Sequence, residues 1–413
     1  MKHYDQKNKN LTIIILLFVV HYLLLSVALA ATPEELRAAI DGKAKDLQEL
    51  NRQIQETQQK IESTQGQQKT LNKELEKLGY NINQVNLGIK SSEINIQKTA
   101  LEIESLKYDI ADKEKAINQS RSAIAELIRN VYQNDHESLL LVILKHNSLA
   151  ASFAEWENIN SVSTNLASTV YQLEDLQNQL SQNLIDESNK KDSLESEQKN
   201  LKNRQLILTD QKQERQTLLS QTKNKEKTYQ QQLQELEERQ AAISDEIENI
   251  EDELRRTFDP TLLPVKRHGL LALPLKNQRI TQNFGEISYL YRGKPHNGMD
   301  FGAAIGTPIF ASADGIVKAV GNNGRYQYGK HILIDHDNNL STLYAHLSKQ
   351  IVTVGQKVIR GQLIGYSGNT GYATGPHLHL GLYWTPSVML KNLPQCNCGL
   401  VPLGVTIDPA DYL

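Results

Sequence analysis

Apolar side chains recur at every seventh position over the first third of the chain, and the series from residue 40 to residue 124 has a single polar member, Gln68. A weaker apolar series runs four residues earlier, from Leu36. A hydrophobic period of 3.5 residues keeps one stripe of an α-helix facing a partner helix, as in a coiled coil. We therefore predict a coiled-coil helix over residues 31–123, with Thr32 as its N-cap and Pro33 in its first turn. The stronger series consists of Ile40, Leu47, Ile54, Ile61, Gln68, Leu75, Ile82, Ile89, Ile96, Ile103, Ile110, Ile117 and Ile124.

A second seven-residue series begins at Leu166 and predicts a return helix over residues 161–258. The segment between the two series, residues 124–160, is denser in apolar residues and contains the run Leu139–Leu144. We interpret this segment as a helical tip where the chain reverses. The two long helices then form an antiparallel hairpin, and each helix of about 90 residues reaches about 130 Å at 1.5 Å per residue. The second series consists of Leu166, Leu173, Leu180, Leu194, Leu201, Leu208, Tyr229, Leu236, Ile243 and Ile250.

The pattern changes at the end of the second series. Pro260, Pro264 and Pro274 interrupt any helix, and we place a linker at residues 259–267. Short β-type runs separated by glycine turns follow, which predicts an all-β domain over residues 268–413. The predicted fold class is α+β multidomain: a long antiparallel α-helical coiled coil followed by an all-β domain built on an antiparallel sheet.

The first thirty residues have the composition of an export signal. A lysine-containing start precedes the apolar run Leu11–Val27, and the small residues of Ala28–Ala30 suit a cleavage site. We predict that residues 1–30 are a signal peptide cleaved after Ala30. The alternative is retention as a membrane anchor. Both interpretations place the remainder of the chain in the periplasm.

The net charge bears on the possible partners, and the cysteine content bears on disulfides and structural metal sites. The formal net charge of −3 gives no reason to expect binding to nucleic acid. The two cysteines, Cys396 and Cys398, are too few for a disulfide framework or for a four-ligand structural zinc site. We interpret them as two partly exposed thiols or as one local disulfide in a loop.

Histidine and aspartate residues of the β domain form three short groups. His296 and Asp300 are four residues apart, His346 follows a predicted strand, and His377 and His379 alternate on another strand, so both imidazoles face the same side. A catalytic zinc ion takes three ligands from His, Asp or Glu and leaves a fourth position for water. Additional imidazoles can then move protons. Two other residues, His331 and His336, we interpret as structural or solvated.

These groups resemble the three signature blocks of the lysostaphin/LytM-type zinc metallopeptidases, in the same order, over roughly residues 285–385. The resemblance implies that His296, Asp300 and His379 bind Zn2+ and that His346 and His377 assist catalysis. It also implies that the chain is a zinc metalloendopeptidase that hydrolyses the peptide cross-links of bacterial peptidoglycan in cell-wall remodelling or daughter-cell separation. The bond that is cut stays open between D-alanyl–diamino acid cross-links and glycine bridges.

The order of the predicted segments resembles the EnvC-type division proteins, which activate periplasmic cell-wall amidases at the division site. In that class the LytM-like domains have lost the metal ligands, whereas all five site residues are present here. The alternative function is therefore an amidase activator. As further hypotheses, the tip binds a membrane-embedded division complex, cell-wall amidases are partners, and residues 225–267 fold over the groove and inhibit it.

Overall fold

The structure of the chain is a computed structural model, and the predicted signal peptide, residues 1–30, lies outside the described residues. The run Leu139–Leu144 of the predicted tip also lies outside them. The described residues are 32–63, 70–134, 148–223, 225–256, 258–276, 279–287, 293–394, 396 and 398–413. No helix in this part of the chain has both the length and the apolar character needed to cross a membrane.

Long helices make up the first part of the chain, as the heptads predicted: α2 (Pro33–Ser63), α3 (Leu71–Asn134), α5 (Leu149–Thr222) and α6 (Glu226–Arg255). At the start of α2, the Glu35 amide donates to Thr32 Oγ1 (3.3 Å) and the Thr32 amide donates to the Glu35 carboxylate (2.7 Å). This reciprocal pair is a capping box and confirms Thr32 as the N-cap.

The helix limits differ from the two continuous helices that we predicted. α2 ends at Ser63 and α3 continues past residue 123, while α5 begins inside the segment 124–160 and the return helix is divided between α5 and α6. The division between α5 and α6 lies at Thr222, where the seam has lost its apolar residues before the second series resumes at Tyr229. α3 and α5 extend into the predicted tip because no proline or glycine in residues 124–134 or 149–160 ends them.

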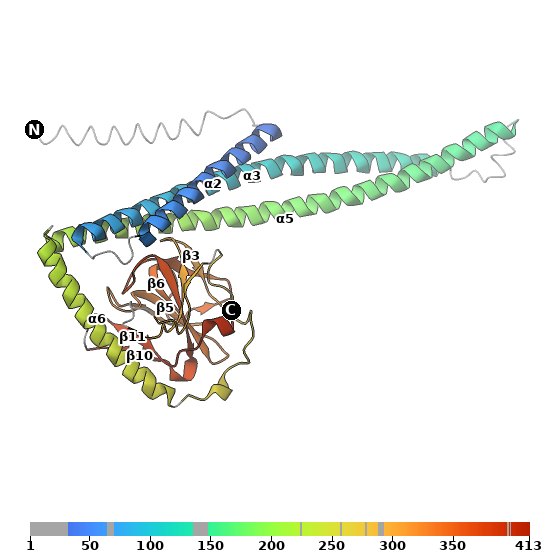
Figure 1. The fold of residues 1–413 in the computed structure, drawn as a ribbon. Helices are drawn as coiled ribbons and strands as arrows, with labels where there is room; N and C mark the ends of the chain where they lie inside the picture. Colours follow the sequence, from blue (N-terminus) through green and yellow to red (C-terminus); the bar gives the residue numbers. More distant parts are fainter. Residues whose placement is uncertain are drawn as a thin grey trace, which may run out of the picture. The chain divides into compact units, whose positions relative to one another are not determined.

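The contacts within the chain divide it into two compact units. Among the described residues, one unit comprises 96–195 together with 32–45, and the other comprises 46–95 together with 196–413. In the first unit α3 and α5 lie side by side (Figure 1), and Lys190 Nζ of α5 lies 2.6 Å from the Glu102 carboxylate of α3.

The second unit shows the direction of pairing between the same two helices. Leu78 of α3 shares a buried cluster with Leu218 of α5, and Val85, one heptad later on α3, packs with Ile207, earlier on α5. Positions that advance along α3 therefore meet positions that recede along α5, so the helices are antiparallel, as predicted.

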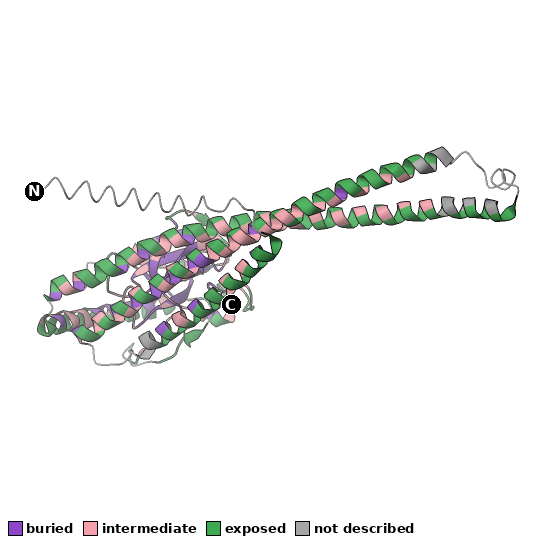
Figure 2. Cartoon of the chain, turned by 90° about the horizontal axis from the view of Figure 1, so that it is seen from above, coloured by how far each residue is buried: buried purple, intermediate pink, exposed green. Residues whose placement is uncertain are grey.

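The C-terminal part of the chain is an antiparallel β domain, which confirms the predicted fold class. Its main sheet has the order β1-β2-β9-β6-β5-β4-β7, with β8 paired to β6 and β3 paired to β8, and β10 and β11 form a separate hairpin. We call the long helices α2, α3 and α5 the arm. Figure 2 shows buried positions gathered in the β domain and exposed positions along most of each arm helix. The strands are β1 (Ile280–Gln282), β2 (Met299–Gly302), β3 (Pro308–Phe310), β4 (Gly315–Asn322), β5 (Lys330–Asp335), β6 (Leu340–Gln350), β7 (Lys357–Val358), β8 (Leu363–Ser367), β9 (His377–Trp384), β10 (Met389–Asn392) and β11 (Leu400–Leu403).

Helix α6 contributes to the core of the β domain. Ile243 and Ile247 are 0% and 6% exposed and share a cluster with sheet residues such as Leu333. At the edge of this contact Lys294 Nζ lies 2.7 Å from Asp245 and 2.6 Å from Glu248. The folded unit around the sheet therefore includes residues well before position 268, where we had placed the start of the domain.

Cys396 and Cys398 are joined by a disulfide and are both buried in the cluster that contains Ile243. The local disulfide is thus the interpretation that agrees with the structure. The alternative of two partly exposed thiols is wrong, because the loop between β10 and β11 packs against α6 and the sheet.

Glu251 of α6 provides a pH test of this packing. Its side chain is 6% exposed and lies 3.8 Å from Arg255, and burial, reinforced by Asp252 and Glu248 and opposed by Arg255, raises its pKa to about 7. A carboxyl group whose folded pKa is raised stabilises the fold at low pH, and this contribution is lost as pH rises through the folded pKa. We expect the free energy of unfolding to fall by about 2–3 kcal/mol between pH 5 and pH 8 from this group.

The Glu251→Gln variant isolates the effect, because other titrating groups cancel in the difference from wild type. Chemical denaturation of both proteins at pH 5 and pH 8 should show little difference at the lower pH and a more stable variant at the higher pH. An equal difference at the two pH values would exclude titration of Glu251 in this range.

Candidate metal-binding and catalytic site

Neighbouring strands bring together site residues that are distant in the sequence. In the sheet, β9 lies between β2 and β6, with His379 directly opposite Asp300 of β2 and Ala345 of β6. His296 lies three residues before the start of β2, and His346 follows Ala345. The antiparallel register therefore places side chains separated by about eighty positions next to one another.

Three of these side chains form a compact group of potential ligands. His296 Nε2 and Asp300 Oδ1 each lie 3.0 Å from His379 Nδ1, and they lie 3.2 Å from each other. Zinc–ligand bonds of about 2.0–2.1 Å in a tetrahedron correspond to ligand–ligand separations of about 3.3–3.4 Å. The observed triangle is close to that size, and His296, Asp300 and His379 together can hold a metal ion.

The protonation of this group also suits a cation. His296 Nδ1 lies 3.2 Å from the Asn283 carbonyl and donates to it, since a carbonyl only accepts, and this contact orients the ring with Nε2 toward Asp300 and His379. Burial raises the pKa of Asp300, but the imidazole of His377 and hydrogen bonds from His296 and His379 outweigh it and hold that pKa well below its usual value. Asp300 is therefore a buried carboxylate that lies beside imidazole nitrogen atoms of His296 and His379.

Gly298 allows this close approach. A Cβ atom at position 298 would lie 2.6 Å from Cε1 and 2.7 Å from Nε2 of His379. Such contacts are far below ordinary van der Waals separation, so any larger residue here would displace the imidazole. The glycine between His296 and Asp300 is thus a steric requirement of the group.

His346 and His377 lie beside the ligand group. Their ring centroids are 4.6 Å apart, and His377 Nε2 lies 3.6 Å from Asp300 Oδ2. His346 Nδ1 donates to the Thr370 carbonyl (2.8 Å) and His377 Nδ1 donates to the Gly375 carbonyl (2.7 Å). Because both Nδ1 atoms are donors, each ring presents its Nε2 atom on the side away from these carbonyls, where it can take part in proton transfer.

The backbone of His346 has the left-handed conformation (φ 58°), which is uncommon for a residue other than glycine. The pairing of β6 with β8 shifts register just after this residue. A local irregularity of this kind turns a side chain out of the regular strand alternation. Burial, followed by the nearby His377 and His379, lowers the pKa of His346 well below its usual value, so the ring is neutral at neutral pH.

The structure thus brings together all five residues that the sequence indicated. His331 and His336 have other roles: His331 Nδ1 donates to the Gly329 carbonyl (2.9 Å), and His336 contacts the Asp314 carbonyl (2.7 Å) and the Thr342 hydroxyl (2.9 Å). Both rings are buried, which agrees with a structural role. Sequence reasoning missed Tyr328, which packs against the ring of His379.

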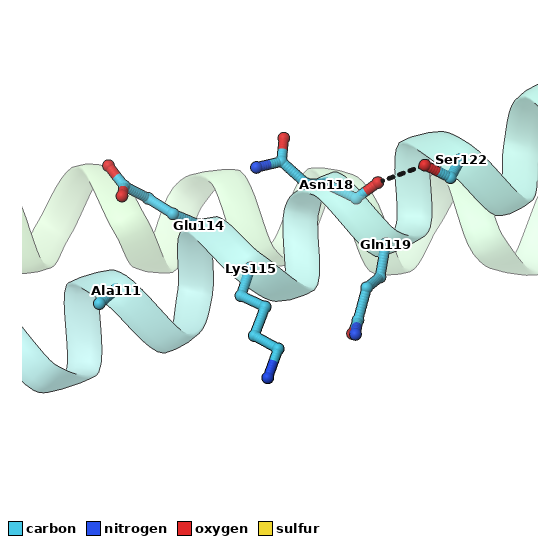
Figure 3. A pocket seen from close by; sticks show the side chains of 6 residues that line it. All are labelled: Ala111, Glu114, Lys115, Asn118, Gln119 and Ser122. Carbon is cyan, nitrogen blue, oxygen red and sulfur yellow. Dashed lines mark hydrogen bonds between the residues drawn. The ribbon is translucent and has the colours of Figure 1, made fainter.

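A hollow on helix α3 lacks the group of metal ligands and imidazoles that the candidate site has. It lies along α3 between Ala111 and Ser122 (Figure 3), and its drawn hydrogen bond runs from the Ser122 hydroxyl to the Asn118 carbonyl (3.0 Å) within the helix. A single helix lines it, and no group of acidic and histidine ligands converges there.

An antiparallel sheet that carries a buried His-Asp-His group beside two further imidazoles has the side chains that a metal-dependent hydrolase would need. Comparison with known proteins is more specific. Residues 294–390 match the sequence model of peptidase family M23, so the chain contains a domain of this family, the family of the lysostaphin/LytM-type enzymes.

Two similar proteins match part of this chain. Peptidoglycan DD-endopeptidase ShyA of Vibrio cholerae is 53% identical over 91 residues, which cover 22% of this chain and 21% of that protein. DD-carboxypeptidase/endopeptidase Mpg of Neisseria meningitidis is 44% identical over 116 residues, which cover 28% of this chain and 26% of that protein. The chain therefore spans about a quarter of the length of these relatives.

Two catalytic domains of known structure match about a third of this chain and nearly all of their own length. The catalytic domain of lysostaphin from Staphylococcus simulans is 32% identical, covers 32% of this chain and 90% of that domain, and superposes with a TM-score of 0.26. The catalytic domain of the M23 protein EnpA from Enterococcus faecalis is 30% identical, covers 34% of this chain and 95% of that domain, and gives a TM-score of 0.27.

Proposed function

We propose that the chain is a zinc-dependent metalloendopeptidase that hydrolyses the peptide cross-links of peptidoglycan. The observation that carries this proposal is the triangle of His296 Nε2, Asp300 Oδ1 and His379 Nδ1, with sides of 3.0–3.2 Å, in a domain of peptidase family M23. These three residues would hold the zinc ion.

When bound, zinc would polarise the scissile carbonyl and lower the pKa of a water molecule to about 7. The residues of the chain supply the proton transfers. His346 is neutral, and its Nε2 can take a proton from the attacking water. His377, whose side chain is 12% exposed, presents Nε2 beside Asp300 and can hold a proton toward the oxyanion or the leaving amine.

The names of two relatives support the choice of bond. ShyA is named a peptidoglycan DD-endopeptidase and Mpg a DD-carboxypeptidase/endopeptidase. We therefore propose D-alanyl–diamino acid cross-links as the substrate, rather than glycine bridges. The apolar run Leu11–Val27 and the small residues of Ala28–Ala30 support export to the periplasm, where this substrate is found.

Recruitment by a membrane-embedded division complex, and amidases as partners, are proposals about the arm. Exposed apolar side chains within the predicted tip (residues 124–160), Ile128 and Tyr132 on α3 and Leu149 and Phe153 on α5, support the first proposal. The intact ligand group argues against an activator without catalysis, because the EnvC-type class that suggested this alternative lacks the ligands.

The decisive experiment is digestion of purified peptidoglycan by residues 31–413, with zinc content measured on the same sample. We expect new amino termini for the wild-type protein. For His346→Ala we expect retained zinc and a rate lower by about 10²–10⁴-fold, because the variant loses a proton acceptor without losing a ligand. Unchanged cleavage by His346→Ala would remove His346 from the mechanism, and absence of new amino termini in the wild type would overturn the proposed function.

A further inference from the structure

Tyr328 contacts three segments of the candidate site. It lies in the turn between β4 and β5 and is 4% exposed. Its carbonyl accepts from the His346 amide (2.9 Å), its hydroxyl accepts from Asn297 Nδ2 (2.9 Å), and its ring lies 5.8 Å from that of His379. One residue thus touches His346, His379 and the residue that follows His296.

The turn that carries Tyr328 is fixed from two sides. The Gln327 amide donates to Gln240 Oε1 of α6 (3.1 Å), and the Gln327 carbonyl accepts from the Tyr372 amide (2.9 Å). On the second side Gly371 is packed so closely that a Cβ atom there would lie 2.4 Å from the Gln327 carbonyl oxygen. The turn has little freedom to move, so the position of Tyr328 is well defined.

We propose that Tyr328 is a positioning residue, which holds the segments of His296, His346 and His379 in the geometry that the reaction requires. The inference rests on the proposed function. Asn297 stands between His296 and Gly298, so its hydrogen bond to the Tyr328 hydroxyl restrains the backbone that carries one ligand. The ring of Tyr328 limits rotation of the imidazole of another ligand, His379.

The alternative is that the Tyr328 hydroxyl only satisfies a buried polar contact. That hydroxyl also lies 2.9 Å from the Tyr383 hydroxyl, which makes Tyr383 a matched control. Tyr383→Phe removes one hydroxyl of the buried pair and keeps the bond between Tyr328 and Asn297. Tyr328→Phe removes both the pair and the bond to Asn297, with the ring retained.

The test measures the zinc dissociation constant by chelator competition, together with kcat and KM, on both full-length variants. For Tyr328→Phe we expect zinc affinity lower by about tenfold or more, the range found when a residue supporting a ligand is lost. We also expect kcat to fall by about tenfold with KM changed less than twofold. For Tyr383→Phe all three quantities should change less than about twofold, although both variants should lower the melting temperature.

Equal effects of the two variants on zinc affinity and kcat would overturn the positioning role and leave a structural contact. The proposed function is tested independently through His379→Ala. If His379→Ala abolishes zinc binding and Tyr328→Phe behaves as wild type, only the positioning role fails. If His379→Ala binds zinc normally, the proposed function fails whatever Tyr328 does.

Discussion

Replacing His379 with alanine should abolish stoichiometric zinc binding and lower the rate of peptidoglycan cleavage by about 10³-fold or more. His379 Nδ1 lies at 3.0 Å from both other ligand atoms, so its removal leaves two ligands where a catalytic zinc ion needs three. Without the ion, neither the activated water nor the polarised carbonyl is available. Metal analysis of the purified protein and counting of new amino termini measure the two effects.

The control for this variant is His268→Ala in the same unit. His268 is exposed and its Nδ1 donates to the Leu413 carbonyl (3.0 Å). It should keep wild-type zinc content and rate, since its ring takes no part in the ligand group. Loss of zinc in His379→Ala with full cleavage would show that the metal is not catalytic, and retained zinc would show that the ligands lie elsewhere.

The sequence predicted which parts of the chain form helices and strands, but it predicted less well where each helix begins and ends. A seven-residue repeat records which face of a helix is apolar, and it predicted the helices of the arm. It does not record where a weak seam breaks, so the ends of α2 at Ser63 and of α5 at Thr222 were missed. The repeat also cannot tell what the apolar face meets. Ile243 continues the second series, yet it is buried against the β domain.

The candidate site was also predicted in part: its histidines and aspartate were recognised in the sequence, and the groups that orient them were not. Side chains with distinctive chemistry can be recognised in the sequence, and alternation on a strand correctly put His377 and His379 on one side. The atoms that orient the imidazoles are the backbone carbonyls of Asn283, Thr370 and Gly375, and any residue type has such an oxygen. Tyr328 was missed for a related reason, because a tyrosine in a turn has no pattern that reveals the long-range contacts of its hydroxyl and ring.

Replacing Ile243 with aspartate should destabilise the β domain by about 4–5 kcal/mol, because the change buries an unpaired carboxylate and removes apolar contact. Ile243 is 0% exposed and packs with the sheet and with the disulfide loop. For a domain whose total stability is about 5–15 kcal/mol, we expect the melting temperature to fall by about 10 °C or more. Ala242→Asp is the matched control: it adds the same charge at the neighbouring, exposed position of α6 and should change stability little.

This variant also separates two roles for α6. If α6 were a removable cover that inhibits the site, Ile243→Asp would release it and raise the rate of peptidoglycan cleavage above that of the wild type. If α6 is part of the folded core, the rate per molecule falls with the folded fraction. We expect the second result, because Ile243 and Ile247 share a buried cluster with Tyr328 and Ala345, the residues that contact His379 and precede His346. A rate increase with an unchanged melting temperature would instead establish self-inhibition by residues 225–267.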